Sequence, residues 1–230
     1  MTLITRYRLA LFLYLANSLY ASDPSIRERL IGAAYLDNQS YGLLEEMTDR
    51  FGGRITGSEA NEQSMTFLEE ALKKQGIKTW REPFTFQGWE RKNDEAILLE
   101  PISRTLRAIA LGYVESHAPF AADVVLIDKA NKDDITADLK GNIGLVPASV
   151  KLTTETIDSL VKERGLRGIL LINRKNGGQL LARTQHRKGK ASPIPIYTIT
   201  EEEGDWLRRL IQRGETPRVQ LTTRSKIKPI

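Results

Sequence analysis

The 230-residue sequence contains no cysteine and only two histidines, and both shortages restrict its chemistry. Without cysteine there is no disulfide framework, no thiolate zinc site and no lipoprotein anchor, and the redox compartment is left open. A hydrolytic zinc site usually takes two or three imidazoles or carboxylates that converge from defined elements. His117 falls in an expected turn and His186 in a basic loop, so we expect both to be surface residues.

Common catalytic motifs are also missing. There is no His-Glu-x-x-His, no Gly-x-Ser-x-Gly, no phosphate-binding Gly-x-x-x-x-Gly-Lys and no dinucleotide-binding Gly-x-Gly-x-x-Gly. The adjacent acids Glu45-Glu46, Glu69-Glu70 and Asp133-Asp134 point different ways on a helix, and solvated carboxylates explain them. Ser58 is explained as a helix cap. We therefore predict no catalytic, cofactor-binding or metal-binding residue in this chain.

Charge of one sign does not dominate, because 34 basic residues face 29 acidic ones. The one basic tract, residues 174–190, lies in a stretch with no acidic residue between Glu163 and Glu201. It could hold a phosphate or an acidic partner, or be a solvated loop. The tract has no Phe, Tyr or Trp on which a base could stack, so we predict no nucleic-acid partner.

Long hydrophobic runs are scarce, and the main one lies near the N-terminus. Arg6 and Arg8 precede an apolar run over residues 9–16, and small residues follow at Ser18 and Ala21. The run is shorter than the roughly 20 residues that span a bilayer. We predict a signal peptide over residues 1–21, cleaved after Ser18 or Ala21, and no stable membrane span; an amphipathic N-terminal helix is the alternative.

Residues 138–172 form the clearest strand, helix and strand unit. The apolar run 143–146 ends at Pro147, and the run 168–173 is apolar almost throughout, which is typical of strands buried on both faces. Between them, residues 153–164 have helical spacing with Thr153 or Thr154 as N-cap and Gly165 as the stop. We expect neighbouring strands in one sheet, with the helix packed across it.

Three helices are predicted before this unit. They cover residues 25–36 after the cap Ser25, residues 40–51 after the cap Ser40, and a third that starts after Ser58 and ends at Gly76. Residues 77–86 then suit an extended segment in which Pro83 favours an edge or a bend.

The composition changes near Gln87 from helical to strand and turn, so we place a domain boundary there. The expected strands cover residues 96–99, 107–111, 123–127, 194–199 and 216–223. Thr200 should cap one more helix, which ends before Gly214, with three glutamates in its first turn. The fold class is therefore mixed α/β.

Several segments together resemble a known family. These are Arg54-Ile-Thr-Gly-Ser-Glu-Ala-Asn-Glu62, Leu72-Lys-Lys-Gln-Gly76, Trp80-Arg-Glu-Pro-Phe84 and Trp89-Glu-Arg91. They are similar to the N-terminal part of secreted co-catalytic zinc exopeptidases of the carboxypeptidase Q type. Residues 138–141, 143–146, 165–169 and 194–204 resemble the protease-associated (PA) domain inserted in those enzymes.

The resemblance implies an N-terminal helical part of a peptidase-like domain over residues 22–87, a PA domain over 88–225 and a return to the peptidase domain at 226–230. In that family the zinc ligands and the glutamate base follow the insert, so the resemblance carries no active-site residue onto this chain. It implies zinc in the complete family members and none in this chain. It also implies that residues 77–86 pair with a strand beyond Ile230.

Two hypotheses follow. The chain is the front portion of a secreted or periplasmic zinc exopeptidase, inactive alone, whose partners are a peptide substrate or the missing catalytic half. Alternatively, it is a self-standing PA-type module that binds a peptide or a protein.

Overall fold

A computed structural model of the chain describes residues 25–36, 39–175, 177–184 and 190–229. The predicted signal peptide, both of its cleavage positions and His186 lie outside these residues. The chain divides into two units, of which the first ends at Gly53 and the second covers Arg54–Ile230. No helix in the described residues is both long and apolar enough to cross a bilayer.

The first unit contains the helices α2 (Ile26–Leu36) and α3 (Gln39–Phe51). Ser25 caps α2 as predicted: its hydroxyl accepts from the Glu28 amide at 3.2 Å, and its own amide donates to the Glu28 carboxylate at 2.7 Å. The cap predicted at Ser40 is wrong, because α3 already includes Gln39 and Ser40 lies inside the helix.

The second unit opens with α4 (Glu59–Lys74), whose N-cap is Ser58, as expected. The Ser58 hydroxyl accepts a hydrogen bond from the Asn61 amide at 3.2 Å. The helix gives way to Gly76, which has the positive φ of 75° that glycine adopts without strain. Residues 77–86 are extended but belong to no strand.

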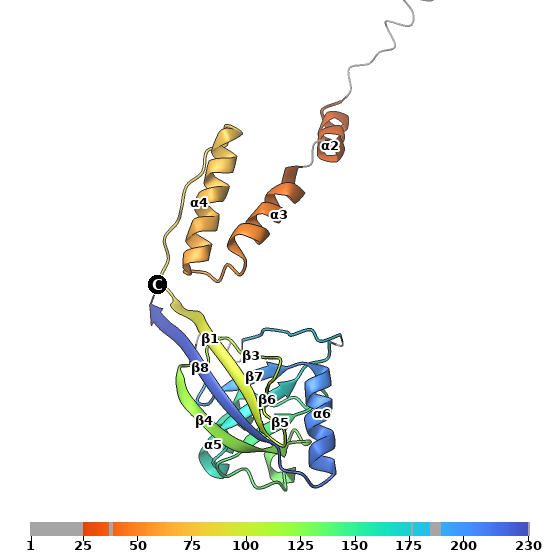
Figure 1. Ribbon diagram of the computed structural model, residues 1–230. Coiled ribbons are helices and arrows are strands. Elements are labelled where there is room, and N and C mark those ends of the chain that lie inside the picture. The colour runs from red at the N-terminus through yellow and green to blue at the C-terminus, as the bar shows by residue number, and fades with distance from the viewer. Residues whose placement is uncertain (1–24, 37–38, 176, 185–189, 230) are drawn as a thin grey trace, which may run out of the picture. The chain divides into compact units, whose positions relative to one another are not determined.

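The rest of the second unit is an eight-stranded mixed sheet in the order β2-β1-β8-β4-β5-β6-β7-β3 (Figure 1). Its strands are β1 (Gln87–Glu100), β2 (Arg104–Thr105), β3 (Ala108–Ala110), β4 (His117–Leu126), β5 (Ile143–Val146), β6 (Gly168–Ile172), β7 (Ile196–Ile199) and β8 (Arg218–Pro229). A short 3₁₀ turn, η1 (Lys132–Asp134), follows β4. The predicted mixed α/β class is confirmed.

The centre of the sheet is parallel: β4, β5, β6 and β7 run the same way as neighbours in that order. The unit predicted over residues 138–172 is confirmed, because β5 and β6 pair in parallel and α5 (Thr154–Arg164) connects them. Thr153 is the N-cap, and Gly165 ends the helix with φ of 67°. Every residue of β5 and β7 is buried, as expected for strands covered on both faces.

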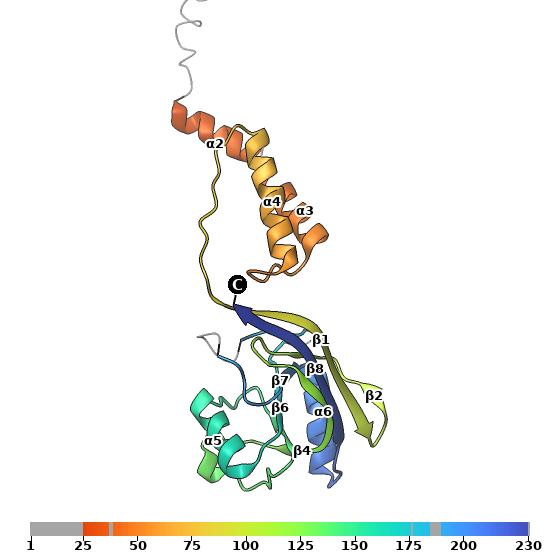
Figure 2. The ribbon, with the colours of Figure 1, turned by 90° about the vertical axis from the view of Figure 1, so that its left-hand side faces the viewer.

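Two helices cover these parallel strands. α5 and α6 (Glu201–Gln212) lie on either side of them (Figure 2). Thr200 caps α6 as predicted, since its hydroxyl accepts from the Glu203 amide at 3.3 Å. Gly204 lets α6 approach β6 closely: a Cβ there would lie 2.5 Å from Cγ1 of Ile172.

The neighbouring strands β1 and β8 are longer than predicted and pair antiparallel over most of their length. The sequence gives few hydrophobic signals over residues 90–95, yet cross-strand partners hold them in β1, among them Glu90 opposite Lys226. Gln87 is opposite Pro229, so the first residue of β1 and the last residue of β8 lie side by side (Figure 2).

One further expectation is wrong, and one polar residue of β8 is unexpectedly buried. Thr222 is 7% exposed, although it is polar. His117 was expected in a surface turn, but it is the first residue of β4, is half-buried and pairs with Thr223 of β8. An interior strand buries polar residues that alternation alone would assign to solvent.

Candidate functional site

The most distinctive surface of the second unit is a groove between α4 and the extended segment 77–86 that follows it. The groove has a volume of about 740 Å³. Its apolar lining comes from both elements and comprises Met65, Leu68 and Leu72 with Trp80, Pro83, Phe84 and Phe86. We call this surface the α4 groove.

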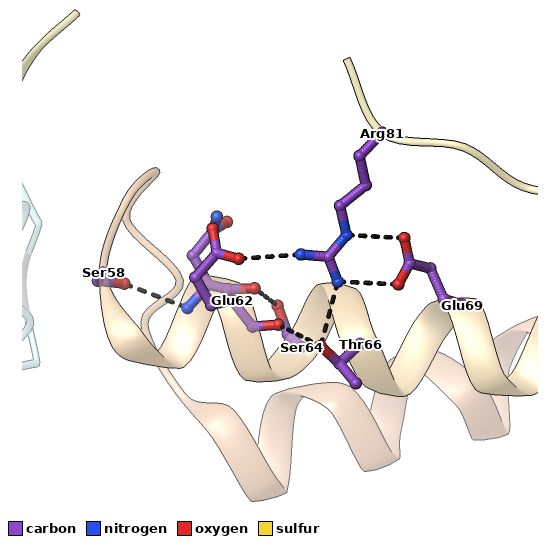
Figure 3. Close-up of polar contacts among 7 residues, drawn as sticks. Ser58, Glu62, Ser64, Thr66, Glu69 and Arg81 are labelled. Carbon is purple, nitrogen blue, oxygen red and sulfur yellow. Dashed lines mark hydrogen bonds and ion pairs between the residues drawn. The ribbon is translucent and has the colours of Figure 1, made fainter. Parts of the chain in front are cut away.

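A single arginine holds the segment against the helix (Figure 3). The Arg81 guanidinium donates to both carboxylate oxygens of Glu69, at 2.7 and 2.8 Å. It also donates to Glu62 at 2.9 Å and to the Thr66 hydroxyl at 3.1 Å. Glu62, Thr66 and Glu69 share one face of α4, and paired bonds to a carboxylate fix both position and orientation.

We call the contacts of Arg81 with Glu62, Thr66 and Glu69 the clamp, and its opposite charges stabilise each other. The hydrogen bond from Arg81 lowers the pKa of Glu69 below its ordinary value, and the bond to Glu69 raises the pKa of Arg81. Both groups are solvent-exposed, so the clamp mainly fixes geometry and adds little to global stability.

The held segment leaves large apolar side chains in water. Trp80 is 76% exposed and Phe84 is 70% exposed. The Phe84 and Phe86 rings stack with centroids 5.6 Å apart, and the Trp80 indole donates to Glu82 at 3.2 Å. Exposed apolar surface of this kind is typical of an interaction site.

The backbone of the segment is also without partners. Ile77 donates back to Leu72 at the end of α4, but residues 78–86 make no backbone hydrogen bond to the described parts of the chain. An extended segment with unpaired amides and carbonyls can accept a further strand. The arrangement therefore suits strand addition over an apolar floor.

The acidic pairs from the sequence do not form an acid-base site. Glu69 bonds to Arg81, and Glu46 pairs with Arg50 at 2.6 Å on α3. Asp133 and Asp134 lie in η1. Ser58 serves as a cap.

The residues that the structure describes do not group into a zinc site. Across the described ranges, no three His, Cys, Asp or Glu side chains are grouped as metal ligands. The Nε2 atom of His117 is buried and has no hydrogen-bond partner there. Burial lowers the pKa of His117, so its imidazole is neutral near pH 7.

Sequence reasoning did not find the clamp. Its partners are 12 to 19 residues from Arg81, outside the range of any helical periodicity. The available signals were an arginine in an otherwise apolar extended segment and acids seven residues apart on α4.

Comparison with known proteins confirms the resemblance. The chain is 24% identical over 210 residues to carboxypeptidase Q of Bos taurus, covering 84% of this chain and 43% of that protein. It therefore spans less than half the length of this relative. No family model matches the chain.

Solved structures agree on the fold. A peptidase M28 precursor from Shewanella amazonensis SB2B superposes with a TM-score of 0.70 at 18% identity, over 88% of this chain and 50% of that one. A zinc aminopeptidase from Bacillus subtilis gives a TM-score of 0.57 at 17% identity, over 84% and 46%.

Proposed function

We propose that this chain is the front portion of a secreted or periplasmic zinc exopeptidase similar to carboxypeptidase Q. It supplies the N-terminal helices and a PA-type domain, while polypeptide outside this sequence supplies the metal ligands and the general base. The similarity to carboxypeptidase Q over 84% of the chain supports the peptidase class. The solved zinc aminopeptidase of similar fold supports zinc as the metal of the complete enzyme.

The α4 groove is the observation that carries this proposal. Arg81 keeps residues 78–86 extended beside α4, with their backbone unpaired and with Trp80 and Phe84 in solvent. A strand of the catalytic half would satisfy that backbone, and its apolar side chains would fill the groove. The partner is therefore the catalytic half of the same enzyme.

The pairing of β1 with β8 supports the same partner. Because Gln87 lies opposite Pro229, a continuation past Pro229 would start beside the unpaired segment 78–86. The chain would then return from the sheet domain to the peptidase-like part through a short connection. This is the geometry expected of a domain inserted into another.

We propose that the zinc ligands come from polypeptide outside this sequence. When bound in such enzymes, zinc acidifies a water molecule and polarises the scissile carbonyl. This chain has no cysteine, and its only histidines are His117 and His186. Its proposed role is to frame the catalytic half and to cover the substrate.

An activity assay tests the proposal. The purified chain with added zinc should show no turnover on a panel of aminoacyl-naphthylamides and dipeptides. Turnover that a chelator abolishes would refute the proposal. Loss of that turnover in H117A would point to His117 as a zinc ligand. The coding DNA past Ile230 gives an independent reading, since an open frame with a His-x-Asp motif supports the proposal.

The alternative is a self-standing PA-type binding module, and one observation favours it. The main hydrophobic core lies entirely within residues 96–221, so the sheet has an interior of its own. Hydrogen exchange separates the two readings: rapid exchange before Gln87 with protection over residues 123–221 means that only the sheet domain is autonomous. Protection of residues 78–86 in the isolated chain would contradict the docking role.

A further inference from the structure

A second hollow lies in the sheet domain, away from the α4 groove, at the carboxyl ends of the parallel strands. Its volume is about 420 Å³, within the range of small-molecule sites. Loops after parallel strands commonly carry ligand sites, because the strand ends place several of them together. We call it the β5–β7 hollow.

The floor of the hollow is a row of one residue from each strand. Val146 of β5 pairs with Leu171 of β6, and Leu171 pairs with Thr198 of β7. All three line the hollow, and Ile157 from the first turns of α5 forms part of its wall. The floor is thus mainly apolar, with one hydroxyl.

That hydroxyl is the first sign of a ligand. Thr198 is 4% exposed, and its side chain makes no hydrogen bond to any part of the chain that the structure describes. Because Thr198 lines the hollow, its hydroxyl is available to donate a hydrogen bond to an acceptor atom of a ligand.

The rim is the second sign, because it carries three cations and no acid. Lys151, Arg174 and Arg183 line the hollow, and none of the described residues that line it is Asp or Glu. Neither Lys151 nor Arg183 forms an ion pair within the described ranges. Like charges gathered without counter-charge create a positive potential that an anion relieves.

The rim is held in place by backbone contacts. Arg174 donates from Nε and Nη2 to the Ala148 carbonyl, at 2.9 and 2.6 Å. The Arg183 carbonyl accepts from the Gly112 amide at 2.7 Å. Asn173, 5% exposed, donates to the Gln179 carbonyl at 2.6 Å and so ties the loop after β6. Arg174 and Arg183 are therefore held in place beside the floor of the hollow.

We propose that the β5–β7 hollow binds a small organic acid, with its carboxylate among the rim cations, its apolar group on the floor and a carbonyl oxygen accepting a hydrogen bond from the Thr198 hydroxyl. No aromatic side chain lines the hollow, so a stacked nucleobase has no platform. The mixture of charge at the rim and apolar surface below suits an acyl amino acid or the C-terminal residue of a peptide. This inference is independent of the exopeptidase proposal.

Calorimetric titration of the full chain tests it with three probes. N-acetyl-L-leucine should bind, while its neutral amide and inorganic phosphate should each bind at least about tenfold more weakly, since one lacks the charge and the other the apolar group. Added salt should weaken binding of the acid. Equal binding of acid and amide, equal binding of phosphate, or no binding of the acid at millimolar concentration overturns the proposal.

Two variants locate the site. The double variant K151Q/R183Q should weaken binding of N-acetyl-L-leucine by about tenfold or more, whereas K129Q/K162Q, which removes two exposed charges elsewhere, should not. T198V should weaken binding without lowering the unfolding midpoint, which a purely structural hydroxyl would lower. Equal losses in the two double variants, or normal binding by T198V, would contradict the assignment.

Discussion

Arg81 and Glu69 meet through two parallel hydrogen bonds, and this pair joins the segment after α4 to the helix itself (Figure 3). The contact positions Trp80 next to the arginine and keeps the neighbouring backbone extended. It decides whether the α4 groove exists, because the groove has one wall from each element.

Removing the clamp should release the segment. R81A is expected to shift the Trp80 emission, with the unfolding midpoint of the sheet domain unchanged. The neighbouring exposed Lys78 provides the control K78A, which should change neither. A lowered unfolding midpoint of the sheet domain in R81A would contradict this prediction, because exposed ion pairs contribute little to global stability.

The clamp should also respond to acid. The folded pKa of Glu69 lies below its ordinary value of 4.5. The stabilisation that its ion pair with Arg81 gives to the held segment is therefore complete above pH 4.5, and it is lost as the pH falls through the folded pKa. The Trp80 emission should therefore stay constant down to about pH 4.5 and change below it. In E69Q this acid step should shrink; a step between pH 5 and 7 would contradict the assignment.

The α4 groove should bind an apolar dye. Anilinonaphthalene sulfonate fluorescence should fall in W80S/F84S, because these side chains expose most of the apolar surface there. The control L36S removes from α2 an apolar side chain that is 90% exposed, and it should have a smaller effect. Equal losses in the two variants would mean that the dye does not recognise the groove.

Close packing of α6 on β6 should make Gly204 irreplaceable. G204A places a methyl group about 2.5 Å from Ile172, and overpacking of this kind costs roughly 1–3 kcal/mol of unfolding free energy. In G42A on α3 the new Cβ meets nothing within 4 Å, and the change should stabilise that helix by about 0.5–1 kcal/mol. Denaturant titration followed by circular dichroism compares them; an unchanged midpoint in G204A would contradict the packing.

A buried phenol connects β7 to β8. The Tyr197 hydroxyl lies 2.6 Å from the Thr222 carbonyl and 2.7 Å from the Thr223 hydroxyl, and burial raises the pKa of Tyr197. Y197F should cost about 1–3 kcal/mol because it leaves buried partners unpaired. Y113F, which removes an exposed hydroxyl bonded to Gln87, should cost much less in the same chemical denaturation experiment.

Local features of the fold were predictable. The caps Ser25, Ser58, Thr153 and Thr200 and the stop at Gly165 follow from hydrogen bonds between residues three or four apart, which a short window of sequence contains. The prediction at Ser40 failed because α3 already includes Gln39, one residue before the predicted cap. The parallel pair β5 and β6 was accessible because hydrophobic runs mark strands covered on both faces.

Strand ends and polar burial were not predictable in the same way. β1 and β8 extend through polar residues because each supplies the partner of the other, and the pairing of Gln87 with Pro229 spans almost the whole domain. His117 is half-buried and Thr222 is buried, and no local pattern records the strands that lie beside theirs.

The sequence by itself determined the helices, their caps, the buried strands and the likeness to carboxypeptidase Q, because these depend on residue type and short spacing. Only the tertiary structure decided which side chains meet. It brought Arg81 to α4, and it set Lys151, Arg174 and Arg183 around one hollow. Such contacts join residues far apart in the chain, and their geometry is fixed by sheet order and packing, which the spacing of residues does not record.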